Sequence, residues 1–407
     1  MLLKLRNDTL MKLLIKLCFI KLLFSSLVYA EENISKKVQW HGFFSQGLLD
    51  VNGSNFINDD GKVSLELTEI GINTSYQIND DFRFAAQGVY LNGGNRFLSG
   101  ARIDYLLLDW AAYNTVDWQA NILFGRIKNN HWLYSTARDI PFARPSIILP
   151  QSVYFDGFRD IAVGSDGIAL NISHNNNDYG DFDFHFTYGN SPISTKNKNV
   201  ILSRYALGEV KQDYSLQTSI YWQPALSQWR LGLAYLDSEF RYDHNEAADA
   251  FVDAEFIFTF YLLNFLYEGE QWEFSGEWHQ KSLVVDGFYY PDYYQDNVGQ
   301  SVYLQSRYKV NKQLTLLTRV EHFYSDKNDK TGRKLEEKSF GSIPRYFGFQ
   351  HDLMFGLSYD LTDSMRLNLE YHLMQGTARL GPVLTPDPVI NNHKNWQIFA
   401  AQFMYWF

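Results

Sequence analysis

Polar and apolar side chains alternate along most of this chain, and this pattern limits the fold more than any other feature. In the segment 365–374, Met, Leu, Leu, Tyr and Leu occupy the odd positions, and Arg, Asn, Glu, His and Met occupy the even positions. Such a two-residue period predicts β-strands with one apolar and one polar face. Few segments have the period of a helix, so we expect an all-β protein.

Sixteen segments carry the alternation. We predict strands at Val38–Leu49, Ser64–Tyr76, Phe82–Leu91, Ala101–Ala111, Val116–Arg126, Gly167–Ser173, Phe182–Tyr188, Tyr214–Trp222, Trp229–Phe240, Ala254–Tyr267, Trp272–Lys281, Ser301–Val310, Leu314–Tyr324, Gln350–Tyr359, Met365–Gln375 and Trp396–Phe407. The longest apolar stretch among them, Phe256–Tyr267, is too short for a membrane helix, which needs about 20 residues.

The connections between these strands alternate in length. Every second one is short, at 77–81, 112–115, 174–181, 223–228, 268–271, 311–313 and 360–364. The intervening ones are mostly longer, at 50–62, 92–100, 127–166, 189–213, 241–253, 282–300, 325–349 and 376–395. Short turns at one end and long loops at the other are typical of an outer-membrane β-barrel, and an even strand count places both chain ends on the same side. We therefore predict a 16-stranded antiparallel transmembrane β-barrel.

The two faces of the predicted strands indicate where water lies. Aromatic residues make up 17% of the chain, and they alternate with charged and polar residues. An apolar outer face against lipid and a polar inner face give a water-filled lumen. A lipocalin-like soluble barrel would have these faces reversed.

The first thirty residues have the pattern of a signal peptide. Lysines precede and interrupt an apolar stretch that ends at Ala30, and Met11 is an alternative start. Residues 31–407 then form one barrel domain. The single cysteine, Cys18, would leave with the signal, so a disulfide framework and a thiolate metal site are excluded, and we expect no cofactor. The net charge of −10 argues against nucleic acid as a partner.

The chain ends on an aromatic residue. Phe403, Tyr405 and Phe407 share one face of the last predicted strand. This ending resembles the sorting signal that the assembly machinery of outer-membrane β-barrels reads. We expect as partners that machinery, outer-membrane lipid and lipopolysaccharide.

The third long connection, 127–166, is the most informative loop. A loop longer than about 12–15 residues is usually functional or disordered, and this one carries many aromatic and apolar residues that must be buried. In sixteen-stranded porins this loop folds into the lumen and sets the constriction. The charged residues that we expect at such a constriction are Arg126, Lys128, Arg138, Asp139, Arg144, Asp156, Arg159 and Asp160. The alternative is that the pairs Arg138–Asp139 and Arg159–Asp160 only pin the loop.

A family resemblance rests on the same region. The motifs are Phe124–Arg126, Leu133–Pro145 and Leu149–Tyr154. They resemble porins related to the phosphate-selective O/P type. The resemblance implies a sixteen-stranded barrel, a folded-in third loop and a homotrimer. Phosphate selectivity in that family rests on arginine and lysine along the pore.

The predicted lumen wall shows no such basic excess. Its bases are Arg83, Arg102, Arg230, Lys281, Arg307, Lys309, Arg319 and Arg366. Its acids are Glu66, Asp104, Asp117, Asp183, Glu273, Glu277, Glu321, Asp352 and Glu370. A ring of charges of one sign gives strong selectivity, whereas mixed charges orient water without choosing one ion sharply. The sequence thus predicts a porin for passive diffusion of small hydrophilic solutes or ions.

Three alternatives stay open beside this interpretation. A channel with a preference for phosphate or other anions would use the arginines of the third loop. A carbohydrate channel would use the aromatic run Phe288–Tyr294, which otherwise serves loop packing. A surface receptor or adhesin with a closed lumen is the third. An enzyme is not expected, because the histidines are scattered and neither Gly-x-Ser-x-Gly nor His-Glu-x-x-His occurs.

Overall fold

The computed structural model describes residues 38–59, 61–159, 164–245 and 248–407. The predicted signal peptide, 1–30, and Asp160 lie outside these residues. The described part contains sixteen strands. Their bounds are β1 Val38–Asn52, β2 Thr68–Gln77, β3 Phe82–Asn92, β4 Gly100–Asn114, β5 Trp118–Lys128, β6 Gly164–His174, β7 Asp181–Asn190, β8 Glu209–Gln223, β9 Trp229–Asp243, β10 Ala254–Glu268, β11 Trp272–Gly287, β12 Tyr294–Lys309, β13 Leu314–Tyr324, β14 Phe349–Thr362, β15 Met365–Gln375 and β16 Asn395–Trp406.

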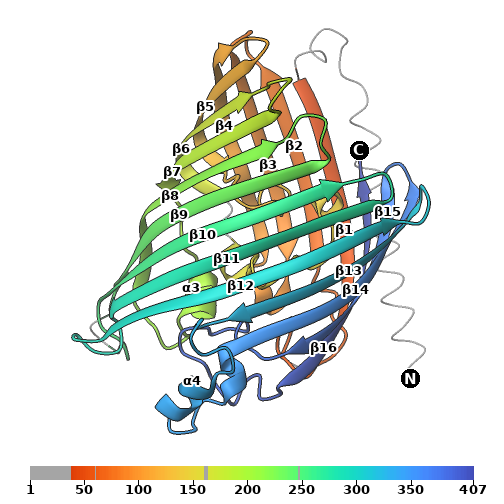
Figure 1. The fold of residues 1–407 in the computed structure, drawn as a ribbon. Coiled ribbons are helices and arrows are strands. Elements are labelled where there is room, and N and C mark those ends of the chain that lie inside the picture. Colours follow the sequence, from red (N-terminus) through yellow and green to blue (C-terminus); the bar gives the residue numbers. More distant parts are fainter. Residues whose placement is uncertain (1–37, 60, 160–163, 246–247) are drawn as a thin grey trace.

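The strands form one closed antiparallel barrel, which confirms the predicted fold. Each strand pairs with its neighbours in the sequence, and β1 pairs with β16, with Phe43 opposite Trp406 and Asn52 opposite Gln397. The strands run obliquely around the ring, and the C-terminus lies at the opposite end from α4 (Arg333–Lys338) (Figure 1). Closure matters because an open sheet edge would leave unpaired backbone groups in lipid.

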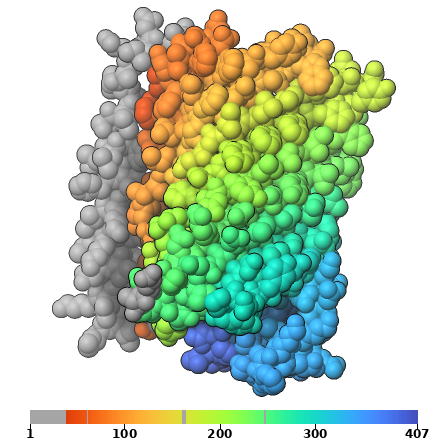
Figure 2. Space-filling view, turned by 90° about the vertical axis from the view of Figure 1, so that its left-hand side faces the viewer, coloured from red at the N-terminus to blue at the C-terminus, as the bar shows by residue number. Residues whose placement is uncertain are grey.

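The alternation of the sequence separates an exposed apolar face from a buried polar one. On β2, the side chains of Ile70 and Ile72 are 39% and 43% exposed. Glu69, which directly precedes Ile70, is fully buried. In a closed barrel these two faces are the outside and the inside. The sequence colours cross the outer surface as oblique bands, as Figure 2 shows for one face.

Aromatic rings line the end of the barrel that carries the short turns, here called the short-turn end. Trp118, His174, Phe182 and Trp222 follow one another along the rim, with ring centroids 4.0, 6.5 and 6.2 Å apart. Further along the rim, the ring centroids of Trp272 and Tyr308 are 4.6 Å apart. Such rings sit where apolar lipid meets water, because they present an apolar body and a polar tip.

The predicted alternation of short and long connections holds with one exception. The prediction of a sixth long connection at 282–300 was wrong. β11 continues to Gly287 and β12 begins at Tyr294, so the connection contains only residues 288–293. Above the exposed apolar band the outer face of β11 becomes polar at Gln280 and Ser282, while its buried face carries Leu283 and Val285. The pattern of apolar residues outside and polar residues inside is therefore lost, although the hydrogen-bond ladder continues. Within the described residues, no helix has the length and apolar character needed to cross a membrane.

Candidate functional site

The third long connection is largely buried. Its described part, 129–159, contains two 3-10 turns, Pro141–Ala143 and Asp156–Phe158. Trp132, Ile147 and Tyr154 are at most 5% exposed. These side chains pack on the buried faces of the strands, because Tyr154 lies beside Tyr303 of β12 and Phe158 lies beside Phe258 of β10.

Carboxylates from three strands accept hydrogen bonds from the backbone of this connection. Glu370 of β15 accepts from the amides of Ile147 and Ile148 at 2.5 and 3.2 Å. Glu321 of β13 accepts from Ser152 at 2.8 Å, and Glu277 of β11 accepts from Leu133 at 3.0 Å. The predicted wall acids Glu277, Glu321 and Glu370 therefore hold the loop backbone. Such charge-assisted bonds are roughly twice as strong as neutral ones.

Glu69 of β2, three strands away from β15 in the ring, binds the arginines of the loop. Two nitrogens of Arg144 bind its carboxylate oxygens at 3.0 and 2.6 Å, and Arg159 lies at 3.6 Å. Arg159 also pairs with Asp139. All four side chains are at most 5% exposed. A fork of this kind fits the planar guanidinium and fixes both position and orientation.

Asp156 forms the second half of this arrangement. It pairs with Arg138 of the loop at 3.1 Å and with Arg96, which follows β3, at 2.7 Å. Burial would raise the pKa of the Asp156 carboxyl, but the two guanidinium groups hold it at about 2. We call Arg96, Arg138, Arg144 and Arg159 with Glu69, Asp139 and Asp156 the arginine cluster. Its charges nearly cancel, as buried charges must.

The predicted constriction residues thus lie mostly in this cluster. Arg138 pairs with Asp156 and Arg159 pairs with Asp139. The expected Arg159–Asp160 pair lies outside the described residues. Lys128 reaches both Asp104, at 2.5 Å, and Asp139, at 2.7 Å. Arg126 lies apart, since it pairs with Asp166 at 3.2 Å on the face that also carries exposed Ile168.

Most of the predicted wall bases also form ion pairs with carboxylates. Near the short-turn end lie the pairs Arg83–Asp109, Arg230–Asp183, Arg307–Glu273 and Arg366–Asp360, at 2.6, 3.5, 2.7 and 2.5 Å. Arg102 lies 3.9 Å from Asp139. Lys309 is exposed at the end of β12. Asp117 is not in the wall, because β5 begins one residue later and Asp117 belongs to the turn before it.

A second buried group surrounds Arg319 of β13. Arg319 lies 3.2 Å from Glu321 and 3.7 Å from Asp352, and it donates to the carbonyl oxygen of Ile148 at 3.1 Å. His372 of β15 contacts Asp352 at 2.7 Å. These predicted wall residues also serve the third connection, because Arg319 binds its backbone directly.

Two cavities meet at Phe155 and Arg379. The larger, which we call the vestibule, has a volume of about 680 Å³ and lies between the third connection, α3 (Thr195–Ile201) and the loop 376–394. The smaller, which we call the inner pocket, has a volume of about 40 Å³. It lies among the third connection and β8 to β11, and Phe155 and Arg379 line both cavities.

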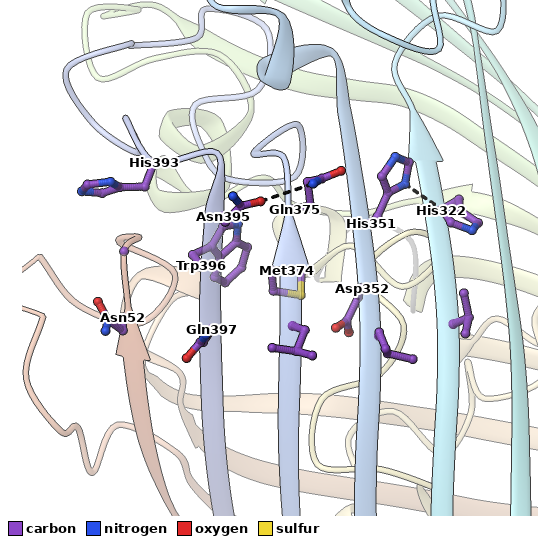
Figure 3. Close-up of a pocket in the computed structure, with 14 residues that line it drawn as sticks. Asn52, His322, His351, Asp352, Met374, Gln375, His393, Asn395, Trp396 and Gln397 are labelled. Carbon is purple, nitrogen blue, oxygen red and sulfur yellow. Dashed lines mark hydrogen bonds between the residues drawn. The ribbon is translucent and has the colours of Figure 1, made fainter.

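A third cavity lies on the outer face near the long-loop end of β13 to β16. Exposed Val320, Leu353 and Leu373 form part of its lining. Figure 3 shows His351 and His322 side by side on neighbouring strands, with their Nδ1 atoms 2.8 Å apart. Among the described residues no cluster of three or more His, Cys, Asp or Glu side chains could hold a metal ion.

The aromatic run considered for sugar binding lies at the tip of the β11–β12 hairpin. Phe288 is buried and stacks on Phe251, with ring centroids 4.2 Å apart. Tyr289 packs against Tyr293 and donates a hydrogen bond to the carbonyl oxygen of Leu384 at 2.8 Å. These contacts fit the packing role that the sequence left open beside the carbohydrate one.

Sequence reasoning missed three residues of this site, Glu69, Arg96 and Arg379. The predicted strand Ser64–Tyr76 placed Glu66 in the wall, whereas β2 begins at Thr68 and its buried carboxylate is Glu69. Ile70 and Ile72 are apolar and lie on the outer face, so the odd-numbered residues of this strand, Glu69 among them, face inward. The sequence contained this signal. Arg379 lies in the loop 376–394, where no periodicity exists to place it.

Comparisons with known proteins agree with this architecture. No protein-family model matches the chain, and none of the curated proteins compared with it matches. Among solved structures, Pseudomonas putida OprB at high pH has a TM-score of 0.59 at 11% identity, covering 92% of this chain and 96% of that one.

Two further porins are similar. OmpF of Salmonella typhi in complex with daunomycin has a TM-score of 0.58 at 12% identity, covering 93% of this chain and 99% of that one. An anion-selective porin from Comamonas acidovorans has a TM-score of 0.56 at 12% identity, covering 91% and 99%. The chain therefore has the fold of the outer-membrane porins.

Proposed function

We propose that this chain is an outer-membrane porin, which forms a water-filled channel for passive diffusion of small hydrophilic solutes or ions. The observation that carries the proposal is the anchoring of the third connection. Its backbone and side chains bind Glu69 of β2, Glu277 of β11, Glu321 of β13 and Glu370 of β15. These strands are spread around a closed ring.

A segment bound to several sides of a ring must cross its interior. We infer that the connection 127–166 lies inside the barrel and narrows the channel. In this proposal the arginine cluster pins the loop to the β2 side, and Arg138, Arg144 and Arg159 set the shape of the constriction while being shielded from solute. Selectivity for phosphate gains no support, because each of these arginines has a carboxylate partner.

The outer face supports the membrane part of the proposal. Exposed Leu231, Leu233 and Phe355 belong to an apolar surface, and the aromatic rim borders it. Lipid and lipopolysaccharide would cover this surface. Export by the signal 1–30, recognition of Phe403, Tyr405 and Phe407 by the assembly machinery, and a homotrimer complete the proposal. The proposed role is non-enzymatic, and the buried carboxylates Glu69, Glu277, Glu321 and Glu370 serve to hold the loop.

Single-channel recording in planar bilayers tests both parts of the proposal. The folded parent protein should conduct, with a current proportional to salt concentration. Glu370→Gln removes the charge that binds two loop amides, so we expect higher or noisier conductance from a loosened loop. Glu337→Gln is the control, because the Arg333–Glu337 pair is exposed and distant from the barrel wall.

The outcomes separate the alternatives. Absence of conductance from correctly folded parent protein would reject the porin and favour a surface receptor with a closed lumen. Conductance that Glu370→Gln leaves unchanged in size and noise would reject the constriction. A reversal potential in a salt gradient then gives the sign of ion preference.

A further inference from the structure

Arg379 differs from the other buried arginines of the barrel interior. It is 4% exposed, yet no carboxylate of the described residues lies within ion-pair distance of it. Its guanidinium stacks 3.7 Å from the centroid of Phe323 and donates to the carbonyl oxygen of Ser152 at 2.8 Å. Its Nε has no hydrogen-bond partner there. Buried charges are normally paired, because desolvation is costly.

Two further nitrogen groups lie around the same pocket. Lys281 of β11 lies over the ring of Phe323 at 5.5 Å, and no described carboxylate lies within ion-pair distance of it either. His279 is 1% exposed and uses Nδ1 on Ser301 at 2.7 Å, which leaves Nε2 without a partner among the described residues. The inner pocket thus has two cations and one open imidazole nitrogen at its border.

The acid that acts electrostatically on Arg379 is already occupied. Glu321 influences Arg379 electrostatically from beyond ion-pair distance. Its carboxylate oxygens bind the Ser152 amide at 2.8 Å and the Arg319 guanidinium at 3.2 Å. The described residues therefore offer no free carboxylate to compensate Arg379 and Lys281, which leaves this place open to an anion from solution.

One wall of the pocket is apolar, formed by the rings of Phe158, Phe240, Phe258 and Phe260 together with Leu236. Gln212, Ser215, Gln217 and Ser238 give the remaining lining a neutral polar character. A multiply charged ion such as phosphate would lose hydration against the rings, and these neutral side chains would replace it only in part. An anion with a carboxylate at one end and a hydrocarbon group at the other would satisfy both parts of the site.

The size of the pocket limits that hydrocarbon group. The space that a water molecule can occupy in it is about 40 Å³, whereas one water needs roughly 10–15 Å³ by the same measure. A tail of one or two carbons fits. Because Arg379 also lines the vestibule, a carboxylate held by it would face the larger cavity while the tail points into the pocket.

We propose that Arg379, Lys281 and His279 form a binding site for short-chain monocarboxylates of the size of acetate or propionate. The site deepens the proposed function, on which it rests for access of solute through the vestibule. Arg379 and Lys281 bind the carboxylate of the solute, and the phenylalanine rings contact its alkyl group.

Calorimetric titration of the detergent-folded protein with sodium propionate tests the site without requiring conductance. We expect saturable binding, with inorganic phosphate at the same concentration failing to compete. Arg379→Met should weaken propionate binding about tenfold or more, since a charged hydrogen-bond partner is lost. Arg204→Met is the matched control, because Arg204 lines only the vestibule.

A second variant tests the apolar part. Leu236→Phe narrows the pocket and retains both cations, so it should weaken propionate more than acetate. If Arg379→Met does not fold, Lys281→Met replaces it in the titration. Equal binding of phosphate and propionate, or unchanged affinity in the Arg379→Met or Lys281→Met protein, would overturn the proposal.

Bilayer recording separates this inference from the proposed function. A protein that conducts but binds no propionate is a porin without this site. A protein that binds propionate but does not conduct has the site and lacks the channel.

Discussion

The sharpest test of the arginine cluster is Glu69→Gln. Glu69 has no exposed surface, and its carboxylate binds Arg144 through two bonds, with Arg159 at 3.6 Å. Ser45 and Gln402 also donate to it, at 3.3 and 2.9 Å. Glutamine has nearly the same shape but no charge. The substitution therefore leaves two buried guanidinium groups short of a partner without opening a cavity.

The cost follows from the burial of the pair. Breaking a buried ion pair by removing one partner destabilises by about 3–5 kcal/mol. At about 1.4 kcal/mol per factor of ten, the docking equilibrium of the loop shifts roughly a hundredfold or more. The barrel itself should persist, because the β1–β2 and β2–β3 hydrogen-bond ladders do not use this side chain.

The assay combines unfolding in urea with single-channel recording. We expect a lower unfolding midpoint and frequent current transitions in Glu69→Gln. Adding Arg144→Met should recover part of the loss, as a double-mutant cycle measures. A Glu69→Gln protein with the parent's unfolding midpoint and quiet current would refute the idea that this ion pair holds the loop.

Three further predictions concern other parts of the molecule. Asp156 has a pKa of about 2 when folded and about 3.9 when unfolded, so its stabilising effect is present above about pH 4 and is lost as pH falls toward 2. The difference in unfolding free energy between the parent and Asp156→Asn should accordingly shrink over that range, and a constant difference would contradict the assignment. Gly125→Ala should lower folding yield at a cost of about 1–3 kcal/mol, because its φ is +120° and a Cβ would lie 2.3 Å from the carbonyl oxygen of Leu106. Gly88→Ala, where a Cβ meets nothing within 4 Å, is the control, and equal yields would argue against strain. Phe407→Ala should reduce barrel yield in membranes of living cells while refolding in detergent continues, and unchanged cellular yield would remove the assembly role.

The strand count and both faces could be predicted from the sequence because each rests on local alternation. Lipid on one side of the wall forces a two-residue period, which is visible without tertiary information. The failure at 282–300 has the same cause, since strands that extend beyond the exposed apolar band lose that constraint while keeping their backbone pairing.

The site was harder to predict because its contacts join distant segments. The sequence identified the third connection and its arginines, but not their partners. Glu69 binds Arg144 from 75 positions away, and Glu370 binds Ile147 from 223 positions away. Charge pairs of this kind depend on barrel register and strand tilt, so a tally of inward acids cannot tell a bare wall charge from one that holds a loop.

The spread of those anchors along the chain has a consequence for how the pore matures. Glu69 belongs to the second strand and Glu370 to the fifteenth. A partly built barrel therefore offers the loop only some of its attachment points, and the last one arrives when the sheet is nearly complete. In the proposed porin, the constriction can take its final form only when the wall around it is nearly complete.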